Sequence, residues 1–171
     1  MNICLSNMTK ALARTFYQKY VPDPALLLDG QSSTSYEYCD AKADATVDRH
    51  RQLGRVYLAV MLDETPIGEV ILKNIDHNAK HCTLSICLCS DEYKNKGYGT
   101  AAERLALQYA FSKMDMEFVL ADTVLKNTRS QRVLEKVGFS ETHRDDAYVY
   151  YRCDRKHWNT RKTAVDPQGS S

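Results

Sequence analysis

The spacing of apolar residues predicts that the N-terminal part of the chain is mostly helical. A short strand over Ile3–Ser6 leads into a helix over Met8–Tyr20, with Asn7 as its capping residue. Pro22 and Pro24 prevent that helix from continuing, because proline lacks the backbone N–H that a helix interior requires.

The middle of the chain changes to the alternating pattern of β-strands. A loop over Ala25–Cys39 and a second helix over Ala41–Leu53, which ends at Gly54, precede this section. Three strands are then predicted: Arg55–Leu62, Ile67–Ile75 and His81–Cys89. The turns between these strands are too short for crossover connections, so the strands should pair in antiparallel fashion.

The C-terminal part alternates between helices and strands. The predicted order is helix, strand, helix and two strands: Gly99–Met114, Phe118–Val124, Thr128–Val137, Phe139–His143 and Ala147–Arg152. The whole pattern predicts a single-domain mixed α/β fold, with a largely antiparallel sheet flanked by helices. This domain should span residues 1–158. Residues 159–171 should form a flexible tail, because Thr163–Ser171 lacks a periodic apolar pattern.

Composition narrows the class of protein. The formal net charge is only +1, whereas a protein that binds nucleic acid through its phosphates needs a strongly basic face, so we expect no nucleic-acid partner. No apolar stretch is long enough for a signal peptide or a membrane span, so we expect a cytoplasmic protein without a membrane partner. The six cysteines should then be reduced thiols.

The segment Tyr93-Lys94-Asn95-Lys96-Gly97-Tyr98-Gly99-Thr100 has the features of an anion site. It follows a strand and opens a helix whose apolar positions are Ala102, Leu105, Ala106, Tyr109 and Ala110. The first N–H groups of a helix lack intrahelical partners, and the helix dipole favours negative charge there. Gly97 and Gly99 allow a phosphate to approach the backbone, and Lys94 and Lys96 add positive charge. The segment is suited to holding a pyrophosphate.

Two other interpretations of this loop compete with a pyrophosphate site. Glycines and lysines can simply form a solvated loop. Gly97-x-Gly99-x-x-Ala102 also satisfies a dinucleotide-binding fingerprint, with Glu117 at about the right distance for the acidic residue. That fingerprint should follow directly from a buried parallel strand, whereas here a polar hexapeptide and three predicted antiparallel strands precede the glycines. The context therefore argues against a dinucleotide site.

The loop resembles the signature of the GNAT superfamily of N-acetyltransferases, a Gln/Arg-x-x-Gly-x-Gly/Ala loop after the fourth strand. Lys94 stands where Gln or Arg is usual. A second block also resembles the family, and is most similar to the branch of bacterial ribosomal-protein N-terminal acetyltransferases: Asn127-x-x-Ser130-x-x-Val133-Leu134-Glu135-Lys136-Val137-Gly138-Phe139. The resemblance covers Met1–Trp158 in element order and specific residues only within Cys87–Phe139. It implies a sheet splayed between strands four and five, with acetyl-CoA as cofactor.

The same resemblance implies roles for the cofactor residues. Backbone groups of Cys87, Leu88 and Cys89 would pair with the pantetheine arm of coenzyme A. The pyrophosphate would be surrounded by Asn95, Lys96, Gly97, Tyr98, Gly99 and Thr100, with Lys94 at the loop entrance. Asn127 would bind the pantetheine near its thiol, although Asn is equally suited to capping the helix that begins at Thr128.

The catalytic residues are harder to assign from the sequence. Many relatives use a tyrosine seven residues after the Asn to protonate the departing thiolate, but Leu134 occupies that position. The resembling branch points to Ser130 instead, the alternative being an ordinary first-turn serine. Many relatives also carry a Glu near what is here Thr83, and this chain does not. Glu69 on the neighbouring strand is therefore our preferred general base. Alternatively, Glu69 is merely an exposed carboxylate on a strand, and a chain of water molecules carries the proton to bulk solvent.

The acceptor should be an amine. Tyr36, Glu37 and Asp40 lie in the segment that shapes the acceptor site in this superfamily, and carboxylates beside aromatic rings suit a cation. The alternative is a solvated loop that leads into a helix capped by Asp40. We expect no metal, because strand parity places Cys82 on the opposite face from Cys87 and Cys89.

The predicted function is transfer of an acetyl group to a primary amine on a small molecule or a protein, by a monomer or homodimer. A catalytically silent acyl-CoA-binding module of the same fold is the alternative.

Overall fold

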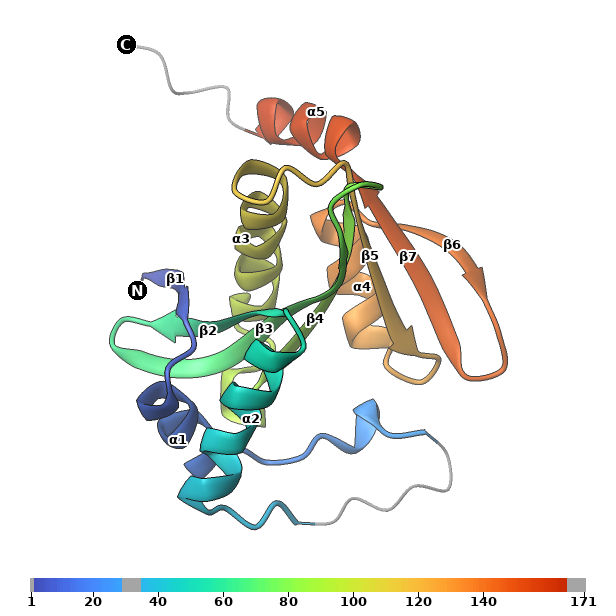
Figure 1. The fold of residues 1–171 in the computed structure, drawn as a ribbon. Coiled ribbons are helices and arrows are strands. Elements are labelled where there is room, and N and C mark those ends of the chain that lie inside the picture. Colours follow the sequence, from blue (N-terminus) through green and yellow to red (C-terminus); the bar gives the residue numbers. More distant parts are fainter. Residues whose placement is uncertain (1, 29–34, 166–171) are drawn as a thin grey trace.

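A computed structural model of the chain describes residues 2–28 and 35–165, and their side chains as far as residue 160. Its elements, shown in Figure 1, are β1 (Ile3–Asn7), α1 (Lys10–Gln18), α2 (Asp40–Gln52), β2 (Val56–Leu62), β3 (Thr65–Asp76), β4 (His81–Leu88), α3 (Tyr98–Ser112), β5 (Phe118–Val124), α4 (Thr128–Val137), β6 (Ser140–Arg144), β7 (Tyr148–Asp154) and α5 (Arg155–Val165). Short 3₁₀ turns occupy Pro24–Leu26 and Asp91–Tyr93.

The strands form one seven-stranded sheet in the order β1-β2-β3-β4-β5-β7-β6. Every neighbouring pair is antiparallel except β4 and β5, which are parallel and are connected through α3. Helices flank the sheet. The predicted mixed α/β class and the largely antiparallel sheet are confirmed.

The sheet opens between β4 and β5. These two strands pair only from His81 with Phe118 to Leu84 with Ala121. On its other side β4 stays paired with β3 as far as Leu88. The β5-facing side of Ser85–Leu88 therefore has no strand partner among the described residues. This is the predicted splay, and Figure 1 shows the lower ends of β4 and β5 diverging.

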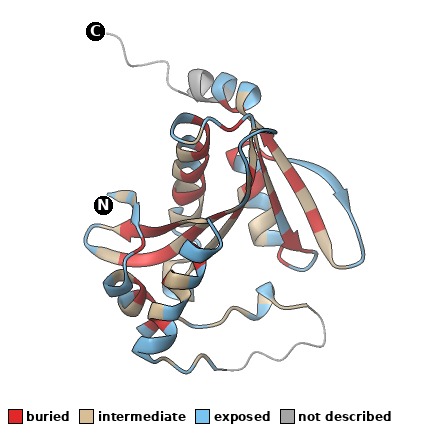
Figure 2. Cartoon of the chain, viewed as in Figure 1, coloured by how far each residue is buried: buried red, intermediate tan, exposed pale blue. Residues whose placement is uncertain are grey.

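Two hydrophobic cores cover the two faces of the sheet. The larger core joins α3, α4 and Trp158 of α5 to one face, with Leu72, Val119 and Val149 among its fully buried members. The smaller core joins α1 and α2 to the opposite face of β2 and β3 around Phe16. Figure 2 shows the buried residues concentrated in the sheet and in the inner sides of these helices. Between these two layers of helices, the sheet lacks pairing between β4 and β5 beyond Leu84 and Ala121.

The buried side of α3 differs from the predicted one. Leu105 and Tyr109 are only half-buried, and the buried positions are Ala102, Glu103, Ala106, Leu107, Ala110 and Phe111. A prediction based on apolar residues alone could not identify the whole buried face of α3, because this face includes a carboxylate, Glu103.

The predicted cap of the first helix is wrong. Asn7 is the last residue of β1, and Thr9 caps α1 by accepting a hydrogen bond at Oγ1 from the Leu12 N–H at 3.2 Å. Pairing with Leu58 of β2 extends β1 to Asn7. Tertiary pairing thus overrides the local capping preference of Asn.

The C-terminal segment contains a helix that the sequence did not predict. Helix α5 continues to Val165, so the beginning of the predicted tail is helical. Its Trp158 is buried with its ring centroid 5.5 Å from that of Phe111. Residues 166–171 of the predicted tail lie outside the described residues, as do residues 29–34 of the predicted Ala25–Cys39 loop. None of the described helices is long and apolar enough to cross a bilayer.

Candidate active site

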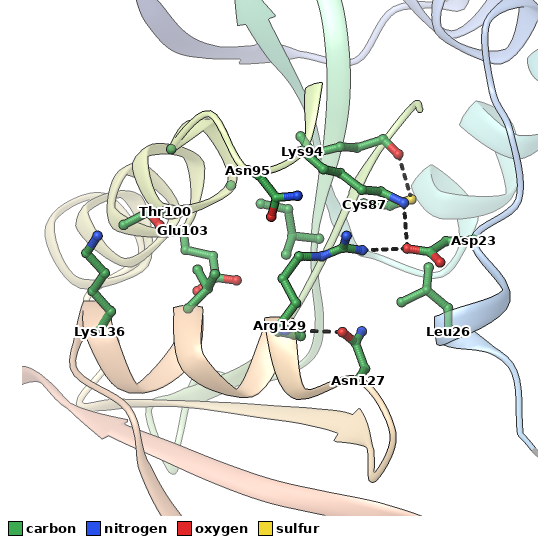
Figure 3. A pocket seen from close by; sticks show the side chains of 16 residues that line it. Asp23, Leu26, Cys87, Lys94, Asn95, Thr100, Glu103, Asn127, Arg129 and Lys136 are labelled. Atoms are coloured by element: carbon green, nitrogen blue, oxygen red, sulfur yellow. Dashed lines mark hydrogen bonds and ion pairs between the residues drawn. The ribbon is translucent and has the colours of Figure 1, made fainter. Parts of the chain in front are cut away.

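The opening between β4 and β5 contains two adjoining pockets. The first, which we call the α3 pocket, has a volume of about 260 Å³ and lies between the start of α3, β4 and α4 (Figure 3). The second, the β3 pocket, has a volume of about 330 Å³ and lies among β3, β4 and β5. Residues that line both are Leu26, Ile86, Cys87, Glu103 and Ser130. The two pockets therefore form one continuous cleft.

The start of α3 forms one wall of the α3 pocket. Gly97 is the N-cap residue and has a φ of 83°, a left-handed conformation that glycine adopts without strain. A Cβ atom built on Gly97 or Gly99 would meet nothing within 4 Å, so the space in front of both is open. The unpaired N–H groups of the first helical turn face a solvent-accessible pocket where the helix dipole favours an anion. This corner fits a diphosphate.

Three cations line this pocket: Lys94, Arg129 and Lys136. Lys94 Nζ and Arg129 Nη2 both contact Asp23 Oδ2, at 2.6 and 2.7 Å (Figure 3). Lys94 also pairs with Asp91. Burial opposes ionisation of Asp23, but the hydrogen bonds from Lys94 and the Ala25 N–H hold its pKa below the usual value. Asp23 therefore stays charged and fixes two cations from distant elements beside the pocket.

Asn127 and Ser130 lie at the start of α4 and line the α3 pocket. Asn127 is buried, and its Oδ1 accepts a hydrogen bond from the Ser130 N–H at 3.1 Å. Asn127 therefore caps α4, which was one of its two predicted roles, and it also reaches the pocket. Ser130 is half-buried and lines both pockets.

The predicted pantetheine edge is only partly brought to the cleft. Cys87 and Leu88 line the α3 pocket, whereas Cys89 is fully buried in the α1–α2 core. The Cys89 N–H donates to the Ile67 carbonyl at 2.8 Å, and its carbonyl accepts from the Val21 N–H at 2.7 Å. The backbone N–H and carbonyl of Cys89 thus already have hydrogen-bond partners within the protein. Strand β4 ends at Leu88, one residue earlier. The described free edge of β4 begins earlier, at Ser85.

The loop residues also divide into two groups. The α3 pocket is lined by Lys94, Asn95, Gly97, Gly99 and Thr100, as predicted. Lys96 and Tyr98 do not line the pocket. Lys96 is exposed, and the ring centroid of Tyr98 lies 6.5 Å from that of Tyr93.

Glu69 lines the β3 pocket within a network of tyrosines. Its Oε2 accepts hydrogen bonds from the Tyr57 hydroxyl at 2.6 Å and the Tyr17 hydroxyl at 3.0 Å. Burial raises the pKa of Glu69, and the two hydroxyl donors oppose that rise. Burial and the charge of Glu69 raise the pKa values of both tyrosines, so both remain protonated donors. Oε1 accepts no hydrogen bond from the described residues.

The two ends of the cleft differ in charge. Among the described residues that line it, the β3 pocket has Glu69, Asp122, Tyr20 and Tyr148 and no lysine or arginine. The α3 pocket has the three cations described above and one carboxylate, Asp23. Glu103 lines both pockets. An anionic group is therefore favoured at one end and a cation at the other.

The residues predicted to bind the acceptor lie beside the β3 pocket rather than in it. Tyr36 stacks on Tyr17, with 5.3 Å between their ring centroids, and so supports the tyrosine network. Glu37 is exposed, and Asp40 begins α2, where it pairs with Arg14 at 3.5 Å and accepts a hydrogen bond from Tyr38. Neither carboxylate lines either pocket, because the start of α2 directs them toward solvent and α1.

Several residues of the cleft were missed from the sequence: Tyr17, Asp23, Tyr57, Glu103, Asp122, Arg129 and Lys136. Arg129 and Lys136 lie within the second family block and could have been found as the cations of that helix. Tyr57 could have been found from its place on the strand next to Glu69. Glu103 left a signal as well, because a carboxylate among small apolar residues of an amphipathic helix is unusual. In the described part of the chain, no group of three or more His, Cys, Asp or Glu side chains is arranged so that it could hold a metal ion.

Comparison with known proteins agrees with this geometry. Residues 2–140 match the family model described as an acetyltransferase (GNAT) domain. The chain is 26% identical, over 67% of each chain, to YdaF of Bacillus subtilis, a protein named as a ribosomal N-acetyltransferase. It is also similar to spermidine N-acetyltransferase from Vibrio cholerae in complex with CoA and spermine, with a TM-score of 0.76, 15% identity and coverage of 92% of this chain and 98% of that one.

A structure from T. thermophilus, described as an acetyltransferase, gives a TM-score of 0.75 at 20% identity, covering 99% of this chain and 95% of the other. These likenesses show a shared fold, and the family match covers most of the chain, which confirms the resemblance to the GNAT superfamily and the expected cofactor. The chain belongs to the GNAT acetyltransferase domain family and is an acetyl-CoA-dependent acyltransferase that acts on an amine.

Proposed function

We propose that this enzyme transfers the acetyl group of acetyl-CoA to a cationic primary amine, by direct attack within a complex that holds both substrates. The observation that supports this proposal is the charge difference along the cleft. Cations and helix N–H groups line the α3 pocket, whereas carboxyl groups and tyrosines line the β3 pocket. One end suits the diphosphate of the cofactor and the other suits an ammonium group.

The residues of the α3 pocket would hold the cofactor. The first turn of α3 would bind the diphosphate, with Arg129 and Lys136 nearby, and the free edge of β4 would pair with the pantetheine amides. When bound, acetyl-CoA supplies the activated thioester. The chain's own task is then to position the amine and to move protons.

Glu69 is the proposed general base. A primary amine is mostly protonated at pH 7, since its ordinary pKa is about 10, and only the neutral amine is a nucleophile. The unpartnered Oε1 of Glu69 can take that proton directly or through one water. Tyr57 and Tyr17 hold the carboxylate in place, and its raised pKa makes it a better base than an exposed glutamate.

Ser130 is the proposed proton donor at the sulfur end. Ser130 lines both pockets, and its backbone is fixed by the Asn127 cap. Leu134 lines the β3 pocket where many relatives have tyrosine, so the nearby hydroxyl of Ser130 is the candidate from α4.

Steady-state assays of CoA thiol release test the proposed function. We expect turnover with at least one member of a panel of spermine, spermidine, a lysine-containing peptide, a peptide with a free N-terminus and an aminoglycoside. Acetyl-CoA should also raise the melting temperature. Absence of any thermal shift with millimolar acetyl-CoA would remove the proposal.

A catalytically silent acyl-CoA-binding module is the second candidate. It is favoured by Leu134 and Thr83, which stand where many relatives carry their acid and base. Cofactor binding without thiol release on any amine of the panel would support this alternative over the enzyme.

A further inference from the structure

One carboxyl group in the cleft has no role in the proposed chemistry. Glu103 lies in the second turn of α3, and only 2% of its surface is exposed. Its Oε2 atom is buried and has no hydrogen-bond partner among the described residues. Glu103 lines both pockets, together with Ile86 and Cys87 of β4 (Figure 3). It therefore lies at the junction between the two ends of the cleft.

Burying a carboxyl oxygen without a hydrogen-bond partner costs free energy of folding. A ligand that binds beside Glu103 could supply the missing partner. Burial raises the pKa of Glu103 to about 8, so the group is mostly protonated at pH 7. A protonated carboxyl group has an O–H to donate, unlike a carboxylate, which only accepts. Glu103 is thus a mostly neutral hydrogen-bond donor whose buried Oε2 atom finds no acceptor in the described part of the chain.

Charged and titratable groups from several elements share the cleft with Glu103: Tyr20, Asp23, Glu69, Cys87, Lys94, Asp122, Arg129, Lys136 and Tyr148. Lys94 and Arg129 are held by Asp23, and Glu69 is held by its two tyrosines. The raised pKa of Glu103 has one cause, burial, and no charge among these groups acts on it appreciably. Since the described residues offer the buried Oε2 atom no partner, a bound ligand is the partner we consider.

We propose that Glu103 binds the pantetheine arm of the cofactor, by donating a hydrogen bond from its protonated carboxyl group to an amide oxygen of the arm. The arm must pass the junction to connect a diphosphate in the α3 pocket with an acetyl group near Glu69. Amide oxygens are the hydrogen-bond acceptors that recur along it. This inference rests on the proposed placement of the cofactor and makes Glu103 a cofactor-binding residue, alongside the loop residues and Asn127.

Titration calorimetry at pH 7 with two ligands tests the proposal. The first ligand is CoA. The second is adenosine 3′-phosphate 5′-diphosphate, which has the nucleotide and diphosphate of CoA but no pantetheine arm. Glu103→Leu should weaken CoA binding about tenfold, the effect of one lost hydrogen bond, and should leave the affinity for the armless nucleotide unchanged. Glu103→Gln keeps an N–H donor of nearly the same shape and should bind CoA within about threefold of the wild type.

Two results would overturn the proposal. Glu103→Leu could bind CoA as tightly as the wild type, or it could lose affinity for CoA and for the armless nucleotide equally, which would indicate a distorted α3 instead of a lost contact. Failure of the proposed cofactor placement looks different, because the wild-type protein itself would then bind neither ligand.

Discussion

The two ends of the cleft are built from different parts of the chain. At the proposed diphosphate end the main groups available for binding are backbone N–H groups at the start of α3, made accessible by Gly97 and Gly99. At the proposed acceptor end the groups are side chains, Glu69 with Tyr57 and Tyr17, which come together from α1, β2 and β3. The first end depends on backbone geometry and the second on tertiary contacts.

This difference teaches where substitutions should act. Binding through backbone groups tolerates changes in most loop side chains, but not a side chain that fills the glycine positions. Catalysis through a carboxylate depends on that one group and on the donors that set its pKa. Cofactor affinity and turnover should therefore separate cleanly between the two ends.

The largest effect should follow from filling the diphosphate end. Gly97→Glu places a side chain and a negative charge in the open corner, and it forces a non-glycine residue to a φ of 83°. CoA affinity should fall by roughly 100-fold or more in titration calorimetry, about 3 kcal/mol.

Gly54→Glu is the matched control for that change. Gly54 also has a positive φ, 63°, and open space around it, but it lies between α2 and β2, outside the cleft. Gly54→Glu therefore introduces a similar backbone strain and the same charge away from the cleft. Equal losses of CoA affinity in the two variants would contradict diphosphate binding by the α3 loop.

At the acceptor end, Glu69→Gln should lower kcat by about 100-fold or more, because the amide cannot accept the amine proton. The CoA dissociation constant should not change, since Glu69 does not line the α3 pocket. Single-turnover and binding measurements separate these quantities. Glu64→Gln, at the exposed β2–β3 turn, is the control and should behave as the wild type. A Glu69→Gln enzyme with unchanged kcat would remove Glu69 from the chemistry.

Between the two ends, Glu103 should limit stability in a pH-dependent way. Its pKa is about 8 in the folded protein against an ordinary value of 4.5, so the folded state holds more protons between these values. Its contribution to the free energy of unfolding is therefore fully present below pH 4.5 and is lost as the pH rises toward 8. Glu103→Gln should be more stable than the wild type by about 3 kcal/mol at pH 7.

Urea unfolding at two pH values checks this prediction. The stability difference between Glu103→Gln and the wild type should largely disappear at pH 4, where the carboxyl group is protonated in both states. A difference of the same size at both pH values would contradict it, because a packing effect would not titrate.

The smallest effect should come from a donor to Glu69. Tyr57→Phe removes the 2.6 Å hydrogen bond that favours the ionised carboxylate, so the pKa of Glu69 should rise further. The acidic limb of the kcat/KM profile should then move to higher pH, while the rate on the plateau changes only about threefold. A shift of that limb to lower pH would contradict the proposed role of the tyrosine.

The end of the cleft that is built from residues close together in the sequence could be predicted from the sequence. The proposed anion site depends on residues within one short segment, so glycine spacing before an amphipathic helix was enough to predict an open pocket at the start of α3. Asn127 and Ser130 were found in the same way, from a local block at the start of α4. The largely antiparallel sheet and the opening between β4 and β5 followed from the element order and the family resemblance.

The acceptor end could not be predicted to the same extent. Glu69 was proposed from its strand, but its donors Tyr57 and Tyr17 are 12 and 52 residues away and meet it only through sheet register and the packing of α1. Glu37 and Asp40 were expected there from composition and the family resemblance, and the start of α2 turns them away. Glu103 was missed because helical periodicity identifies apolar positions and gives no place to a buried acid.

The proposed chemistry rests on Glu69 acting as the group that takes the amine proton. The most direct test is the pH dependence of kcat/KM for thiol release, measured with a reactive amine for the wild type and Glu69→Gln. In the wild type the rate should rise with pH through a pKa above 4.5, as the carboxyl group ionises, and this limb should be missing in the variant. Superimposable profiles for the two enzymes would contradict the account.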